Sequence, residues 1–168
     1  MTGLSESSES VELYLVRHAH AGNPARWDGD DDVRPLSPKG RLQAERLGAL
    51  LVAAGIEFGV LLTSSRLRAV QTAEILAQAL DVTIHEEERL GQGPTLRDVA
   101  AIISEAGVID RLLLVGHDPD FSDIATDLVG APISVRKGSL VRIDVDARSI
   151  APGTGVLRWL IPPDVLGA

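Results

Sequence analysis

Arginine and histidine side chains suited to phosphate chemistry occur at three places in this sequence. Arg17 and His18 end a first short apolar run, Arg68 lies shortly after a second, and His117 follows a third. Guanidinium groups stay charged at every working pH and bind phosphate oxygens through paired N–H donors. A neutral imidazole is a competent nucleophile toward phosphorus. These residue types are suited to binding a phosphate-like anion, provided that the fold brings the three places together.

The apolar runs alternate with segments of helical periodicity. We predict strands at residues 12–17, 60–63, 82–85 and 111–116, and helices at residues 38–54, 65–80, 95–106 and 119–129. Two further strands are expected at residues 139–145 and 155–161. Alternating strands and helices form βαβ units. The sequence therefore predicts an α/β protein, a single three-layer α/β/α domain with a mainly parallel sheet covered on both faces.

The candidate residues fall at the carboxyl ends of three predicted strands. His18, Ser64 and His117 each follow such a strand directly, and ligands of open parallel sheets bind beyond these ends. Each motif alone has an ordinary explanation, as a surface Arg-His pair, a solvated arginine face of a helix, or a turn histidine after glycine. Their combination at three strand ends favours an anion site.

Three segments resemble the signature motifs of the histidine phosphatase (phosphoglycerate mutase-like) superfamily. They are residues 15–19 (LVRHA), 68–73 (RAVQTA) and 115–117 (VGH). The finer pattern is similar to that of SixA-like phosphohistidine phosphatases, in residues 34–40, 116–119 and 157–163. The resemblance extends over nearly the whole chain and implies a phosphoglycerate mutase-like fold.

The resemblance also implies a role for each matching residue. His18 would be the nucleophile that is phosphorylated during turnover, and Arg17 and Arg68 would hold the phosphoryl oxygens. His117 would complete the phosphate pocket, and Arg34 would reach into it from the long loop after His18. We expect one ring nitrogen of His18 to donate to a backbone carbonyl, which fixes the tautomer and leaves the other nitrogen free to attack.

The sequence departs from the family pattern at the general acid. Many members protonate the leaving group with a carboxylic acid from the region after the third strand, here residues 85–94. Glu88 in this region, and Asp118 and Asp120 beside His117, are the candidates. Without a proton donor for the departing alkoxide, hydrolysis is slower by a factor on the order of 10²–10⁴, whereas imidazole leaves easily. The departure therefore favours a phosphohistidine substrate.

Two smaller features carry structural expectations. Ala19 replaces a glycine found in many members of the superfamily, and it would be strained if the backbone there required a positive φ. The run Asp30–Asp32 lacks the ligand spacing of a calcium loop. We therefore expect it to be a solvated loop.

Composition limits the other possibilities. The 168 residues include 24 acidic and 16 basic side chains, a net charge of −8, and no cysteine. This excludes disulfides and thiol chemistry and disfavours nucleic acid or an anionic membrane as a partner. No motif for a nucleotide cofactor or a metal is present, so neither is expected. We predict a flexible tail at residues 1–10, a histidine phosphatase domain at 11–168, and, since the N-terminus lacks signal-peptide features, a cytoplasmic location.

We predict a metal-independent phosphatase that works through a covalent phosphohistidine on His18. The favoured substrate is a phosphohistidine on a protein, and the product is inorganic phosphate. One alternative is a phosphatase of small esters, such as a sugar phosphate or a nucleotide, with the same mechanism. Another is a non-catalytic module that binds phosphate or a phosphoprotein. Replacing His18 by alanine separates the binding module from the enzymes.

Overall fold

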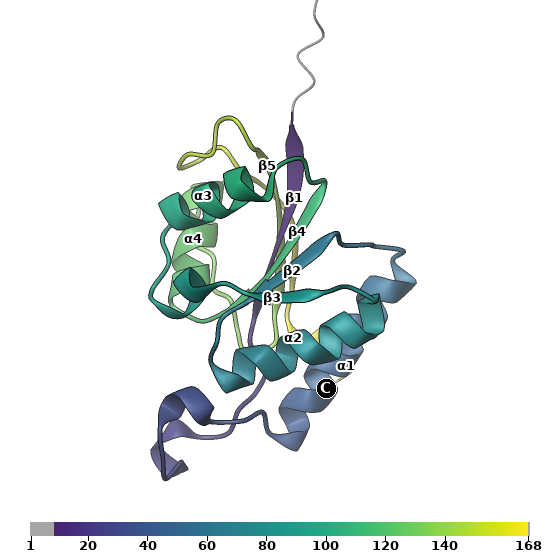
Figure 1. The fold of residues 1–168 in the computed structure, drawn as a ribbon, viewed down its shortest axis with the longest axis vertical. Coiled ribbons are helices and arrows are strands. Elements are labelled where there is room, and N and C mark those ends of the chain that lie inside the picture. The colour runs from purple at the N-terminus through teal and green to yellow at the C-terminus, as the bar shows by residue number, and fades with distance from the viewer. Residues whose placement is uncertain (1–8, 168) are drawn as a thin grey trace, which may run out of the picture.

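One sheet of six strands organises residues 9–167, which are the residues that the computed structural model describes (Figure 1). The strands are β1 (Ser10–Arg17), β2 (Val60–Thr63), β3 (Ile84–Glu86), β4 (Arg111–Gly116), β5 (Leu140–Asp146) and β6 (Val156–Ile161). Their order in the sheet is β3-β2-β4-β1-β5-β6. The first four are parallel, whereas β5 and β6 run antiparallel to their neighbours. The sheet is therefore mainly parallel, as predicted.

Helices cover both faces of this sheet (Figure 1). The four helices of the described part of the chain are α1 (Pro38–Ala53), α2 (Leu67–Leu80), α3 (Leu96–Ala106) and α4 (Asp120–Val129). Side chains alternate along β1, so that Leu13 and Leu15 pack in a core with α3 and α4. Tyr14 and Val16 point the other way, into a core with α1 and α2. The two cores on opposite faces confirm the three-layer arrangement.

Two glycines allow helices to approach the strand ends closely. Ser37 caps α1 by accepting a hydrogen bond from the backbone N–H of Gly40 at 3.1 Å. The first turn of α1 then packs on the backbone carbonyl of His20, where a side chain at Gly40 would find no room. At the end of β4, a Cβ on Gly116 would lie 2.6 Å from the ring of Phe121 in α4. Glycine at both positions thus holds the loops after β1 and β4 against the helices.

The predicted strands and helices are all present, with shifted ends. β3 is shorter than predicted, and α2 begins two residues later. β1 begins earlier, at Ser10, because Ser10 pairs with Asp146 of β5. Residues 1–8 of the predicted tail lie outside the described residues. None of the helices within residues 9–167 has the length and apolar character needed to cross a membrane.

Candidate active site

The three predicted motifs meet at the carboxyl ends of β1, β4 and β2, which are adjacent in the sheet. The backbone ladder continues past the strand ends. The N–H of His18 donates to the carbonyl of Gly116 at 2.9 Å, and the N–H of Ser64 donates to the carbonyl of Val115 at 3.0 Å. The ring centroids of His18 and His117 lie 5.3 Å apart. Backbone hydrogen bonds therefore fix the relative positions of the two imidazoles.

The tautomer of His18 follows from its hydrogen bonds. Nδ1 lies 2.8 Å from the carbonyl oxygen of Ala19. Because a carbonyl oxygen only accepts, Nδ1 carries the proton and Nε2 presents a lone pair. Nε of Arg68 donates to this Nε2 at 3.3 Å. The predicted carbonyl partner of His18 is confirmed, and the unprotonated nitrogen faces an arginine.

The surroundings of His18 keep its imidazole neutral. The residue is 5% exposed, and burial lowers the pKa of its imidazole to about 3. The hydrogen bond to Ala19 raises this pKa, whereas the charges of Arg68 and Arg17 lower it further. His18 is therefore unprotonated at neutral pH, as an attacking imidazole must be.

His117 is the second buried imidazole of the site. Its Nε2 and the fully buried hydroxyl of Ser64 form a hydrogen bond of 2.7 Å. Its Nδ1 is buried and has no hydrogen-bond partner within residues 9–167. Burial lowers the pKa of His117 to about 3, and the nearby His18 and Arg66 lower it further. Ser64 thus fixes the orientation of this imidazole.

The low pKa values of these two histidines predict that the protein is less stable in mild acid. In the unfolded chain their pKa is near 6.5, and in the folded protein it is about 3. Their contribution to the free energy of unfolding is therefore complete above pH 6.5. It is lost as the pH falls toward 3, because the unfolded state then binds more protons than the folded state. Between pH 7 and pH 4.5 we expect a loss on the order of 2 kcal/mol per histidine. Urea unfolding of the wild type and of His117→Gln measures it, and equal pH dependence in both would contradict it.

Two arginines flank the histidines. Nη1 of Arg17 donates to the carbonyl of Val135 at 2.9 Å and lies 3.5 Å from the carboxylate of Asp118. Arg68, in the first turn of α2, has a buried side chain. Its Nη1 and Nη2 donate to the backbone carbonyl and the carboxylate of Asp31, at 2.6 and 2.9 Å. The structure thus places both predicted phosphate-binding arginines beside His18.

Two aspartates of the long loop contact arginines of the site. Asp31 lies in a 3₁₀ turn, η2 (Asp31–Val33), and Asp32 forms an ion pair with Arg66 at 3.1 Å. Both aspartate side chains are more than half exposed, yet each binds an arginine at the site. The predicted exposure of this loop is confirmed, but the sequence did not predict these two ion pairs. The loop folds back over the arginines that follow the strands. The pattern of residue types along the chain does not reveal this path.

Arg34 is connected to the site indirectly. Its side chain is buried, and its Nη1 donates to the carbonyl of Ala21 at 2.6 Å. Its Nε donates to Oδ1 of Asp31 at 2.8 Å, while Oδ2 of Asp31 accepts from Arg68. Asp31 therefore links Arg34 to the arginine that contacts His18.

The three candidate acids have different environments. Oδ1 of Asp118 accepts from the backbone N–H and the hydroxyl of Ser122, at 3.1 and 2.7 Å. Glu88 is exposed and accepts from the amide of Gln92 at 2.8 Å. Asp120 is half-buried in the first turn of α4, where burial raises the pKa of its carboxyl group. The surroundings of Asp120 therefore favour a retained proton.

Two further residues support the site. The hydroxyl of Thr72 accepts from the backbone N–H of Ala19 at 3.1 Å and donates to the carbonyl of Arg68 at 2.7 Å, which ties α2 to the loop after β1. The half-buried Lys137 adds positive charge that lowers the pKa of His18. Thr72 lies in the RAVQTA motif, which is a signal for it, whereas no sequence signal distinguishes Lys137. Ala19 is buried and, within the described residues, does not have a positive φ, so alanine is unstrained there.

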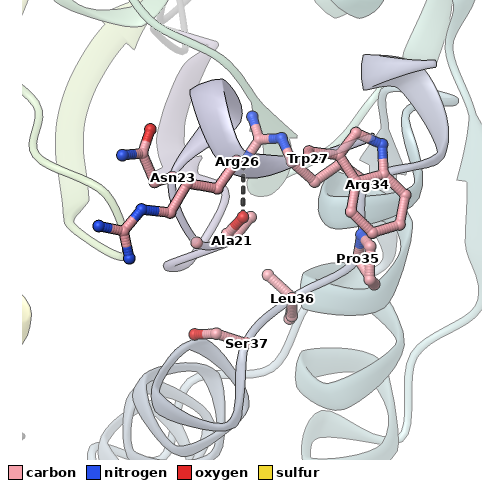
Figure 2. Close-up of a pocket in the computed structure, with 9 residues that line it drawn as sticks. Ala21, Asn23, Arg26, Trp27, Arg34, Pro35, Leu36 and Ser37 are labelled. Carbon is pink, nitrogen blue, oxygen red and sulfur yellow. Dashed lines mark hydrogen bonds between the residues drawn. The ribbon is translucent and has the colours of Figure 1, made fainter. Parts of the chain in front are cut away.

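A cavity of about 280 Å³ is lined in part by Arg34 (Figure 2). Figure 2 shows the guanidinium of Arg34 bound to Ala21, with Trp27 on one side of the opening and Arg26 on the other. Leu36 adds an apolar wall. An apolar hollow with a few polar groups is typical of a small-ligand subsite.

Comparison with known proteins identifies the class. The histidine phosphatase superfamily (branch 1) matches residues 13–92. An uncharacterized protein of Picosynechococcus sp. is 32% identical over 168 residues, which cover 90% of this chain and 100% of that protein. The chain belongs to the histidine phosphatase superfamily, and it is a phosphatase.

Two more similarities are informative. An 8-oxo-(d)GTP phosphatase of Mycolicibacterium smegmatis is 40% identical over 118 residues, 70% of this chain, and the match spans about a third (34%) of that protein. The structure of the protein histidine phosphatase SixA complexed with tungstate has a TM-score of 0.80 at 21% identity, covering 93% of this chain and 99% of that chain. The fold is therefore that of SixA and its structural relatives, which confirms the predicted phosphoglycerate mutase-like fold.

Proposed function

We propose that this phosphatase transfers the phosphoryl group of its substrate to Nε2 of His18. The observation that carries the proposal is the hydrogen bond between Nδ1 of His18 and the carbonyl of Ala19, because it leaves Nε2 unprotonated. Arg17 and Arg68 bind the phosphoryl oxygens and stabilise the charge that develops on them. His117, oriented by Ser64, donates to the same group from the other side.

The reaction has two displacements at phosphorus. In the first, a bond forms between Nε2 of His18 and phosphorus while the bond from phosphorus to the leaving group breaks. In the second, a water molecule attacks phosphorus, the bond to Nε2 breaks, and inorganic phosphate leaves with the water oxygen. The imidazole returns to its starting tautomer, since Nδ1 keeps its proton throughout.

For the substrate we propose a phosphohistidine side chain on a protein. Asp118 accepts hydrogen bonds from Ser122, and Glu88 is exposed and accepts one from Gln92; the proposal gives neither of them the role of proton donor. Cleavage of a phosphohistidine releases imidazole and depends little on a proton donor, whereas cleavage of an alkyl phosphate ester depends on one strongly. The similarity in fold to the protein histidine phosphatase SixA supports the same substrate class.

A second candidate is a small phosphate ester, in particular a nucleotide. Two observations favour it: the 40% identity to an 8-oxo-(d)GTP phosphatase and the cavity beside Arg34, where Trp27 offers an aromatic surface. In this case the half-buried Asp120 is the group best placed to retain a proton for the leaving oxygen.

Initial rates on a phosphohistidine peptide, an alkyl phosphate and 8-oxo-dGTP separate the two substrates. We expect the highest kcat/KM on the peptide, and we expect Asp120→Asn to leave that value within about twofold because imidazole needs no strong acid. Faster hydrolysis of the alkyl ester or the nucleotide, with a large loss in Asp120→Asn, would replace the phosphohistidine proposal by the second candidate. Asp123→Asn, on the same helix, is the matched control.

A further inference from the structure

The carboxylate of Asp31 occupies the donors of two arginines at the site. Its Oδ2 accepts from Nη2 of Arg68 at 2.9 Å, and its Oδ1 accepts from Nε of Arg34 at 2.8 Å. Its backbone carbonyl accepts from Nη1 of Arg68 at 2.6 Å. Both Nη atoms of Arg68 are therefore bound to Asp31, and only Nε points at His18.

A carboxylate between two guanidinium groups offers the same interactions as two oxygens of a phosphoryl group. Both anions accept from the paired N–H donors of arginine. Each Nη atom of Arg68 keeps a second N–H group, but the Asp31 carboxylate and a phosphoryl group bound to the same guanidinium would lie side by side and repel each other. We propose that Asp31 is an internal competitor for phosphate, which the phosphoryl group must displace from Arg68. The inference rests on the proposed function, in which Arg68 binds the phosphoryl oxygens.

The burial of the three side chains shows which partner can move. The side chains of Arg68 and Arg34 are 5% and 7% exposed, whereas that of Asp31 is 51% exposed. Asp31 also lies in the three-residue turn η2, while Arg68 belongs to α2 and Arg34 is held by the carbonyl of Ala21. The aspartate can therefore turn into solvent while the arginines remain in place.

Competition of this kind weakens the binding of phosphate by a constant factor. The apparent dissociation constant equals the intrinsic one divided by the fraction of molecules in which Arg68 is free. Inorganic phosphate, the product, is then released more readily. A phosphorylated substrate with contacts beyond its phosphoryl group recovers the lost affinity elsewhere.

A positioning role for Asp31 predicts the opposite result. If Asp31 served to align Arg68 for catalysis, its removal would weaken phosphate binding. If it competes, its removal strengthens binding. The direction of the change therefore decides between the two roles.

The experiment is a titration of the full chain with inorganic phosphate by calorimetry. We expect Asp31→Asn, which keeps the shape and removes the charge, to bind phosphate about tenfold more tightly than the wild type. Asp31→Ser should also bind phosphate more tightly than the wild type. It replaces Asp31→Asn in the test if Asp31→Asn melts at a lower temperature than the wild type. Asp28→Asn is the matched control, because Asp28 is exposed in the same loop and forms no ion pair within the described residues.

Arg68→Ala separates failure of this inference from failure of the proposed function. Unchanged or weaker phosphate binding in both Asp31 variants, with binding lost in Arg68→Ala, would overturn the competitor role and keep the phosphate site. Wild-type phosphate affinity in Arg68→Ala would overturn the proposed role of Arg68, and the competitor role with it. An equal gain in Asp28→Asn would show an effect of overall charge and would also overturn the inference.

Discussion

Replacing His18 by asparagine is expected to lower kcat by about 10⁴- to 10⁶-fold, the range seen when a catalytic nucleophile is removed. Asparagine fills much of the same space and can retain a hydrogen bond to the carbonyl of Ala19, which His18 contacts at 2.8 Å. It has no nitrogen lone pair that can attack phosphorus. The measurement is phosphate release from a phosphohistidine peptide and an aryl phosphate, without added metal.

The matched control for this variant is His85→Asn. His85 is exposed in β3, and we expect its substitution to leave kcat unchanged. If His18→Asn retained more than about a tenth of wild-type kcat, His18 would not be the nucleophile. If the wild type bound phosphate but turned over neither substrate, the binding-module alternative would replace the enzyme assigned here.

Replacing Arg68 by lysine is expected to lower kcat/KM by about 10²-fold or more. Lysine keeps the positive charge but loses the planar fork of N–H donors. Nε of Arg68 lies 3.3 Å from Nε2 of His18, so its donors face the atom at which the phosphoryl group would be transferred. The loss should appear in kcat as well as in KM, because charge on the phosphoryl oxygens is greatest in the transition state.

Arg97→Lys provides the control for the same chemical change. Arg97 is exposed on α3 and forms no ion pair within residues 9–167. We expect it to keep wild-type kcat/KM. Equal activity of Arg68→Lys and Arg97→Lys would show that charge alone suffices at position 68 and would remove the argument from guanidinium geometry.

The fold was predictable because local signals agree with one another along the chain. Ser37 caps α1, Thr95 and Asp98 cap α3, and Gly107 and Gly130 follow the last residues of α3 and α4. Alternating elements then specify a mainly parallel sheet. The early start of β1 was not predictable, because Ser10 is ordered by pairing with Asp146 on a strand far along the chain.

The core of the candidate site was predictable for a related reason. His18, Ser64 and His117 follow strands directly, so strand pairing alone brings them together. Residues that reach the site from loops were predicted less well. The contacts of Asp31 with Arg34 and Arg68, and of Asp32 with Arg66, depend on how an irregular loop folds back. No periodic pattern encodes that path.

The central claim is that His18 is phosphorylated during turnover. The most direct measurement mixes the enzyme with a phosphohistidine peptide, quenches the reaction in base within milliseconds, and maps phosphate on the chain by mass spectrometry. The account predicts up to one phosphoryl group per chain, located on His18, stable in base, labile in acid and absent from His18→Asn. Turnover without any phosphorylated enzyme, or a phosphoryl group on a different residue, would contradict it.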